Sequence, residues 1–165
     1  MLSESIIALI LIGICLIIHT TGIVSLGVVL VSRRGSIGSR FATVHNPLLL
    51  IGAFATLMLL HLAETCIWAA FYSWQGLFGD YETSLYFSLG TYTTIGYGDV
   101  LLPQNWRLLG ALEGISGVLL CGLSTAFLFT VLSALFQLRI QRMKGGKDLP
   151  GSALNSERTS HEPEQ

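Results

Sequence analysis

The stretch Ser88-Leu89-Gly90-Thr91-Tyr92-Thr93-Thr94-Ile95-Gly96-Tyr97-Gly98-Asp99 lies between two long apolar runs and ends in the letters TTIGYGD. Gly96 and Gly98 supply backbone angles that residues with a Cβ avoid, so successive carbonyl groups turn toward one side of the chain. The Thr94 hydroxyl adds an oxygen to the same row. A row of oxygens is what a dehydrated hard cation needs. One chain supplies one wall of such a site, so a closed ring requires several chains.

The composition is that of a membrane protein. Of the 165 residues, 52% are hydrophobic and 12% are charged, whereas a soluble domain carries about 25% charged residues. The net charge of −1 suggests no nucleic-acid partner. Cys15, Cys66 and Cys121 fall inside apolar runs, which indicates reduced packing residues rather than disulfides. No cysteine or histidine spacing resembles a zinc site, and we expect no cofactor.

Three apolar runs, residues 6–31, 47–72 and 108–138, are long enough to cross a bilayer, which needs ~20 residues. The first follows Glu4 rather than a basic segment and is too long for a signal peptide, so we expect a retained helix. We expect the threonines that follow His19 to bond back to their own helix. His19 itself is expected to face a neighbouring helix, because one isolated histidine completes no ligand site.

Basic residues mark the ends that we expect in the cytoplasm. Residues 32–46 carry three arginines and no acid, and residues 139–147 carry four more basic residues. The positive-inside rule places both segments in the cytoplasm and the N-terminus outside. The polar tail 151–165 is expected to be disordered. At the opposite side, Asp80, Glu82 and Asp99 would gather near Arg107 at an outer mouth and raise the local cation concentration.

The second run, 47–72, has a clear helix start and an aromatic end. It starts at Asn46-Pro47, a favourable helix start, and ends near Trp68, Tyr72 and Trp74, which we expect to form an aromatic belt. Residues 81–92, capped by Asp80, are too short to span a membrane. They suit a re-entrant helix, which is tolerated only when it is buried in protein.

His61 and Glu64 are three residues apart and so share one helix face. A glutamate at a bilayer centre costs about 3 kcal/mol even on the lenient insertion scale, so Glu64 should face protein or water. We favour a hydrogen-bonded pair that ties the second run to another helix. The alternative is a pair that senses protons.

The residues from Thr93 to Asp99 closely resemble the selectivity filter of potassium channels, in which four TVGYG loops surround the ion with carbonyl groups. Ile95 stands where valine is usual. The resemblance covers residues 47–138, which are similar to the pore module of a bacterial two-helix potassium channel with one N-terminal helix added. A match of this length between two spans is much more specific than a lone glycine-rich turn.

The resemblance implies a homotetramer and assigns roles along the chain. Potassium ions would bind at Thr94, Ile95, Gly96 and Tyr97, with Gly98 completing the filter. Some family members carry a glutamate at the position of Gly90 that bonds the counterpart of Asp99, so this chain needs other filter supports. The expected supports are Thr93, Asp99, Glu113 and Glu64.

The third run contains the expected gate. Gly117 matches the glycine hinge of bacterial potassium channels by its spacing from the filter, and Gly114 is close to that position. Val118, Cys121 and Thr125 fall at helical spacing on the face that would line the cavity, with ordinary helix packing as an equal alternative.

Together these patterns predict an all-α membrane protein. It has three transmembrane helices, a re-entrant pore helix and a filter loop, with the N-terminus outside and the C-terminus cytoplasmic. We divide it into an extra N-terminal helix (1–31), a basic loop (32–46), a pore module (47–138) and a tail (139–165).

The expected function is a potassium-selective channel subunit, not an enzyme, in the cell (plasma or inner) membrane, with lipid and potassium ions as its partners. Three alternatives remain: a poorly selective cation channel, a non-conducting regulatory subunit, and an intramembrane enzyme or haem protein using His19, His61 and Glu64. Against the last, the sequence shows no second histidine suitably placed on either helix.

Overall fold

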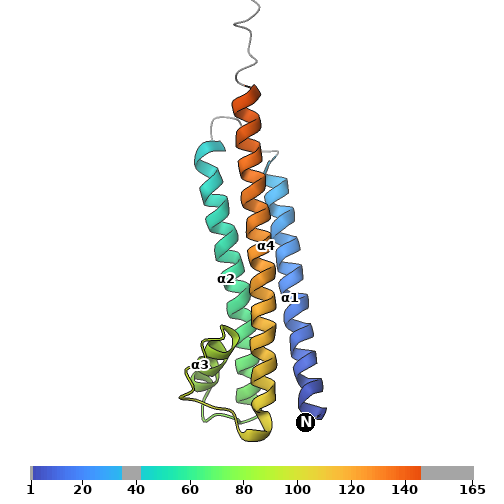
Figure 1. Cartoon of the computed structure of the whole chain (residues 1–165), viewed down its shortest axis with the longest axis vertical. Helices are drawn as coiled ribbons and strands as arrows, with labels where there is room; N and C mark the ends of the chain where they lie inside the picture. Colours follow the sequence, from blue (N-terminus) through green and yellow to red (C-terminus); the bar gives the residue numbers. More distant parts are fainter. Residues whose placement is uncertain (1, 35–41, 146–165) are drawn as a thin grey trace, which may run out of the picture. The chain divides into compact units, whose positions relative to one another are not determined.

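The computed structural model describes residues 2–34 and 42–145. These residues form four α-helices and one short 3-10 helix, with no strand among them, so the all-α class is confirmed (Figure 1). The elements are α1 (Leu2–Arg34), α2 (Ala42–Trp74), α3 (Tyr81–Tyr92), the 3-10 helix η1 (Gln104–Trp106) and α4 (Arg107–Gly145).

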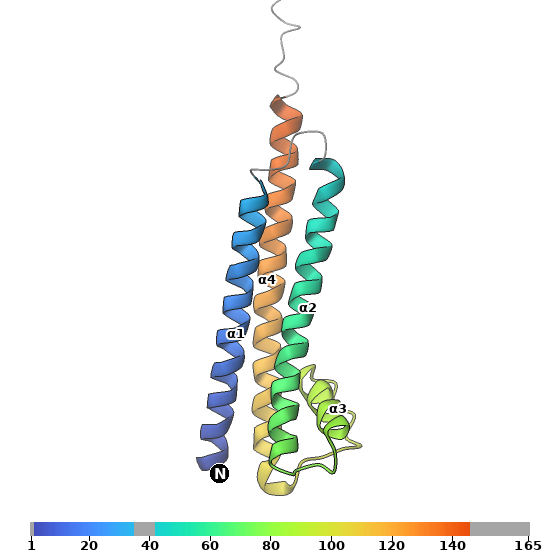
Figure 2. The ribbon, with the colours of Figure 1, turned by 180° about the vertical axis from the view of Figure 1, so that it is seen from behind.

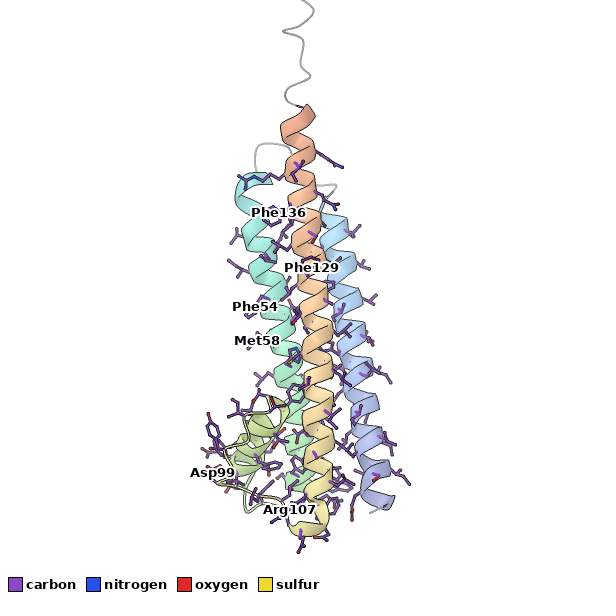
Figure 3. All side chains as sticks on the ribbon, in the orientation of Figure 1. Phe54, Met58, Asp99, Arg107, Phe129 and Phe136 are labelled. Carbon is purple, nitrogen blue, oxygen red and sulfur yellow. The ribbon has the colours of Figure 1, made fainter. Side chains whose placement is uncertain are left out.

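Three helical segments are long and apolar enough to cross a membrane: Glu4–Ser32, Leu48–Trp74 and Gln104–Gln141. Their outer faces carry many exposed apolar side chains. Phe54 and Met58, for example, are each 55% exposed and point away from the neighbouring helices (Figure 3). Apolar surface on this scale is what a protein shows to lipid or to partner chains, and the chain is a membrane protein.

Two helices are longer than the sequence pattern indicates. Helix α2 begins at Ala42, five residues before the expected start at Pro47. Pro47 lacks an N–H for the carbonyl of residue 43, so it removes one hydrogen bond near the helix end without ending the helix. Helix α4 continues to Gly145 rather than to residue 138.

The expected basic loop is shorter than predicted, because α1 extends through Arg34. The remainder of that loop, residues 35–41, lies outside the described residues, as does the tail at 146–165.

The chain divides into two compact units, residues 1–129 and residues 130–165. The second unit holds the last part of α4, where Phe136 and Ile140 are exposed. In the first unit, α1 and α4 begin at the end where α3 lies, and α2 runs in the opposite direction (Figures 1 and 2). All the contacts discussed below belong to the first unit.

The core of the first unit is aromatic near α3. Trp68 and Tyr72 are fully buried, so the expected aromatic belt is wrong for both, although Trp74 is 80% exposed. The two lie four residues apart on one face of α2, and the Tyr72 ring meets Phe87 of α3 at 5.4 Å between centroids. The buried cluster that contains these two rings consists of Ala8, Leu11, Cys15, Trp68, Tyr72, Tyr92, Leu102, Leu109 and Leu120.

Helix α3 begins where the sequence predicts, because Asp80 caps it. The Thr83 backbone N–H donates to Asp80 Oδ1 at 2.6 Å, and the Thr83 hydroxyl donates to Oδ2 at 3.1 Å. These hydrogen bonds to the charged form, the backbone one foremost, hold the pKa of the Asp80 carboxyl below its usual value. The cap fixes the start of the helix that leads into the TTIGYGD stretch.

The end of α3 lies directly against α4 at a glycine. A Cβ added to Gly117 would collide with the backbone carbonyl oxygen of Tyr92. Backbone cannot move aside as a flexible side chain does, so this approach depends on the missing side chain. Gly22 of α1 likewise faces Leu60 of α2, whose Cδ1 would lie 2.6 Å from an added Cβ.

We predict that Gly117→Ala lowers the free energy of unfolding by about 1–3 kcal/mol, the usual range for overpacking. Gly122→Ala is the matched control on the same helix, because nothing lies within 4 Å of its Cβ position. The control is expected to be neutral or stabilising, since alanine is the better helix former. Thermal unfolding of the two purified variants in detergent makes the comparison. Equal stability of the two would contradict the proposed contact.

Candidate functional site

The backbone after α3 alternates between two conformations. Thr94, Gly96 and Gly98 have φ of 62°, 54° and 79°, and Thr94 is the one non-glycine residue with positive φ in the described part of the chain. Alternating left-handed residues can bring backbone groups of one kind to one side of a turn. The stretch is tied to α3 by the Thr94 N–H, which donates to Thr91 O, and the Gly96 N–H, which donates to Gly90 O, both at 3.0 Å.

A β-branched residue at positive φ is strained, and no sequence pattern indicated this strain at Thr94. Such strain gathers at functional sites. All residues from Thr93 to Asp99 are exposed in the single chain, including Ile95 at 57% and Tyr97 at 69%. The stretch from Thr93 to Asp99 is therefore left uncovered by the chain that forms it.

Side chains of α3 support this stretch from one side. The Tyr97 ring stacks on Tyr86, with centroids 6.1 Å apart and planes 10° apart. The Tyr86 hydroxyl donates to Asp99 Oδ2 at 2.9 Å, and this bond raises the pKa of the Tyr86 phenol. The Thr93 hydroxyl donates back to Leu89 O at 2.6 Å. Tyr86 thus contacts both Tyr97 and Asp99, and sequence reasoning did not identify it as a support of this stretch.

Glu113 of α4 is fully buried and joins two other helices. It accepts the Tyr72 hydroxyl of α2 at 2.6 Å and the Ser88 hydroxyl of α3 at 2.5 Å. The Ser88 hydroxyl also lies 3.0 Å from the Thr65 carbonyl oxygen. Glu113 therefore braces the middle of α3, whereas Asp99 is held by Tyr86.

Glu64 belongs to a second buried group, which includes α1. Its Oε1 lies 2.8 Å from His19 Nδ1, and its Oε2 accepts the Tyr92 hydroxyl of α3. His61 Nδ1 lies 2.9 Å from the Tyr92 oxygen and 3.4 Å from Glu64 Oε2. His61 and Glu64 thus both contact the Tyr92 hydroxyl, within a larger cluster than the expected pair.

Ser124 of α4 completes that cluster. Its Oγ lies 3.0 Å from His19 Nε2 and 3.0 Å from His61 Nε2. The two imidazole rings are 4.9 Å apart between centroids, so the expectation that no second histidine is suitably placed was wrong. His19 does face a neighbouring helix as expected, and the Thr20 hydroxyl bonds back to Leu16 O at 2.7 Å.

The predicted gate residues all belong to α4, and they differ in their surroundings. Gly114 faces α3, where an added Cβ would lie 3.3 Å from Thr91 O, and Gly117 meets Tyr92. Val118, Cys121 and Thr125 are all exposed in the single chain, as cavity-lining residues would be before assembly. Their role in gating stays a prediction.

Comparison with known proteins places the chain in a class. A family model described as an ion channel matches residues 48–134, just over half of the chain, and the chain belongs to this family. Helix α1 precedes the matched residues.

One relative is similar to part of the chain. Over 64 residues the chain is 42% identical to the calcium-gated potassium channel TvoK of Thermoplasma volcanium. That match covers 38% of this chain and 18% of the relative, so the chain spans under a fifth of the relative's length. No solved structure matches the chain.

We predict that Glu113→Ala lowers the free energy of unfolding by about 1–3 kcal/mol, because the buried Tyr72 hydroxyl loses its acceptor. Glu113→Gln keeps one acceptor oxygen and is expected to have a smaller effect. The exposed first-turn residue Glu82 supplies the control, Glu82→Ala. Thermal unfolding reports the difference, and equal stability of wild type and Glu113→Ala would sink the bracing role.

A second prediction concerns Tyr86 and Asp99. Because Asp99 raises the pKa of the Tyr86 phenol, Asp99→Asn is expected to let Tyr86 deprotonate at lower pH. The contact is complete below the ordinary tyrosine pKa of about 10 and is lost as pH rises through the raised value. Ultraviolet titration of tyrosinate measures this, with Tyr86→Phe subtracted to isolate the one phenol. A Tyr86 titration that Asp99→Asn leaves unmoved would contradict the hydrogen bond.

Proposed function

We propose that this chain is a subunit of a potassium-selective channel that conducts K⁺ passively through a tetrameric pore. The observation that carries the proposal is the alternation of positive φ at Thr94, Gly96 and Gly98 within the TTIGYGD stretch. Backbone carbonyls facing one way replace the hydration shell of potassium. The ion would meet the carbonyl oxygens of Thr94, Ile95, Gly96 and Tyr97 and the Thr94 hydroxyl, with Gly98 completing the filter.

Exposure of the filter supports an oligomer. One chain leaves the stretch from Thr93 to Asp99 open, and a carbonyl ring around an ion needs walls on every side. A largely apolar groove beside it, lined partly by Phe87, Leu101 and Leu102, offers a surface for a neighbouring subunit. Val118, Cys121 and Thr125 would then line the cavity, with Gly117 or Gly114 permitting the bend that opens it.

The proposed topology follows from charge. The basic segments of 32–46 and 139–147 would face the cytoplasm, with the N-terminus outside. Asp99 and Arg107 both lie at the end of the first unit that holds α3 (Figure 3), which we assign to the outer mouth. Helix α3 would then be re-entrant, with the partial negative charge of its C-terminal end directed toward a cation in the pore.

Reversal potential in planar bilayers under a potassium/sodium gradient tests the function. Purified wild type is expected to reverse near the potassium equilibrium potential. Gly96→Ala should abolish or shift that potential, because a Cβ is strained at φ +54°.

Gly90→Ala is the matched control. Gly90 lies inside α3, nothing is within 4 Å of its Cβ position and it has no positive φ. It should conduct as wild type does. A reversal midway between the two equilibrium potentials would point to a poorly selective cation channel. Absence of current from a folded tetramer in all conditions would favour a non-conducting subunit.

A further inference from the structure

The second buried cluster is a closed ring of hydrogen-bond contacts. One carboxylate oxygen of Glu64 contacts His19 Nδ1, and His19 Nε2 contacts Ser124 Oγ. Ser124 Oγ also contacts His61 Nε2. His61 Nδ1 contacts the Tyr92 hydroxyl, which donates to the other oxygen of Glu64 and so closes the ring. Every polar atom of these side chains is used, and the ring joins four helices: α1, α2, α3 and α4.

When Glu64 is ionised and both histidines are neutral, the ring has one hydrogen fewer than it has contacts. Each of its five contacts requires one hydrogen between two heavy atoms. Ser124, Tyr92 and each neutral histidine supply one hydrogen, and an ionised Glu64 supplies none. Four hydrogens cannot fill five contacts. At one of the five contacts, two acceptor atoms would then face each other with no hydrogen between them. The negative charge of Glu64 would also be buried without compensation. Both effects are strongly unfavourable inside a protein.

We propose that the ring binds one exchangeable proton as a unit and that this proton holds α1 against the pore module. With the fifth hydrogen the ring is neutral overall, whether the proton sits on Glu64 or on a histidine beside an ionised Glu64. His19 is the member of the ring that α1 provides. Loss of the proton in alkaline solution puts two acceptors in contact and loosens the attachment of α1.

Other titratable groups face Glu64 from the same helices. The thiols of Cys15 on α1 and Cys121 on α4 interact with it electrostatically. From α3, the titratable group that faces Glu64 is the Tyr92 hydroxyl. Glu113 on α4 also interacts with Cys15, and its carboxylate is bound to Tyr72 and Ser88. None of these groups supplies the missing hydrogen through a contact in the ring.

A proton fits the ring better than a metal ion does. Ligand atoms of His19, His61 and Glu64 lie within 4.8 Å of one another. A zinc ion would bind each histidine nitrogen directly, at about 2.0–2.1 Å, and would replace the hydrogens between these atoms. The contacts between neighbouring members, 2.8–3.0 Å for the four that include a histidine nitrogen, are hydrogen-bond lengths.

Two substitutions change the count in defined ways. In Glu64→Gln the amide N–H supplies the fifth hydrogen permanently, so the ring closes with neutral histidines and has no proton to lose. Ser124→Ala removes two contacts and one hydrogen, so three contacts remain with three hydrogens. Neither variant requires an extra proton, and Ser124→Ala removes no ionisable group.

The test is a pH titration from 6 to 10 of the full chain in lipid nanodiscs. Nitrogen-15 NMR of labelled histidines, assigned with His19→Asn and His61→Asn, reports the imidazoles, and the infrared carboxyl band reports Glu64. In wild type we expect His19, His61 and Glu64 to change together at one pH, with loss of one proton. Glu64→Gln and Ser124→Ala should abolish that step, and Thr20→Ala, which alters a hydroxyl bonded to its own helix, should keep it.

Separate titration of the two histidines near pH 6.5, unaffected by Ser124→Ala, would overturn the proposal. So would one zinc ion per chain in the purified protein with spectra that respond to a chelator, because the cluster would then be a metal site. The thermal midpoint should fall with rising pH across the shared step in wild type and stay flat in Glu64→Gln. Because none of these measurements uses ion current, their result is independent of the proposed channel function.

Discussion

Helix α3 is held in place by two buried carboxylates that come from different helices. Glu64 on α2 accepts the Tyr92 hydroxyl, and Glu113 on α4 accepts the Ser88 hydroxyl. Ser88 and Tyr92 are four residues apart, so one face of a short helix carries both anchors. The helix is too short to cross a membrane, and its position depends on these contacts together with the close approach of Gly117. The conformation of the stretch that follows depends in turn on where α3 ends.

Local sequence signals predicted the local structure well. Residues 81–92 form the expected helix because Asp80 caps it, and the three apolar segments form long helices because few residues within them favour any other state. The family resemblance, built on TTIGYGD, agrees with the match over residues 48–134. The start of α2 was missed because a proline near a helix end removes one bond and need not terminate the helix.

The buried polar contacts were beyond the reach of the sequence. His19 and Glu64 are separated by 45 residues, and Ser124 lies 105 residues from His19. On helices that are apolar all round, no periodic polar stripe shows which face meets which neighbour. Each histidine, considered alone, completed no site, and a serine in an apolar run carried no signal at all. The pairing of Tyr86 with Asp99 likewise depends on how the chain folds back after α3.

Thr94 combines a left-handed backbone with a side-chain hydroxyl that would meet the ion under the proposed function, and this combination limits which residues suit the position. The left-handed conformation disfavours a β-branched residue by about 1–2 kcal/mol, so glycine would relieve the strain at φ 62°. Glycine would also remove the hydroxyl, and valine would keep the strain while losing the oxygen. Serine keeps the hydroxyl without the branched Cβ. Backbone stability therefore favours glycine at this position, whereas the proposed ion contact favours a hydroxyl residue, and serine is the substitution that loses least of either.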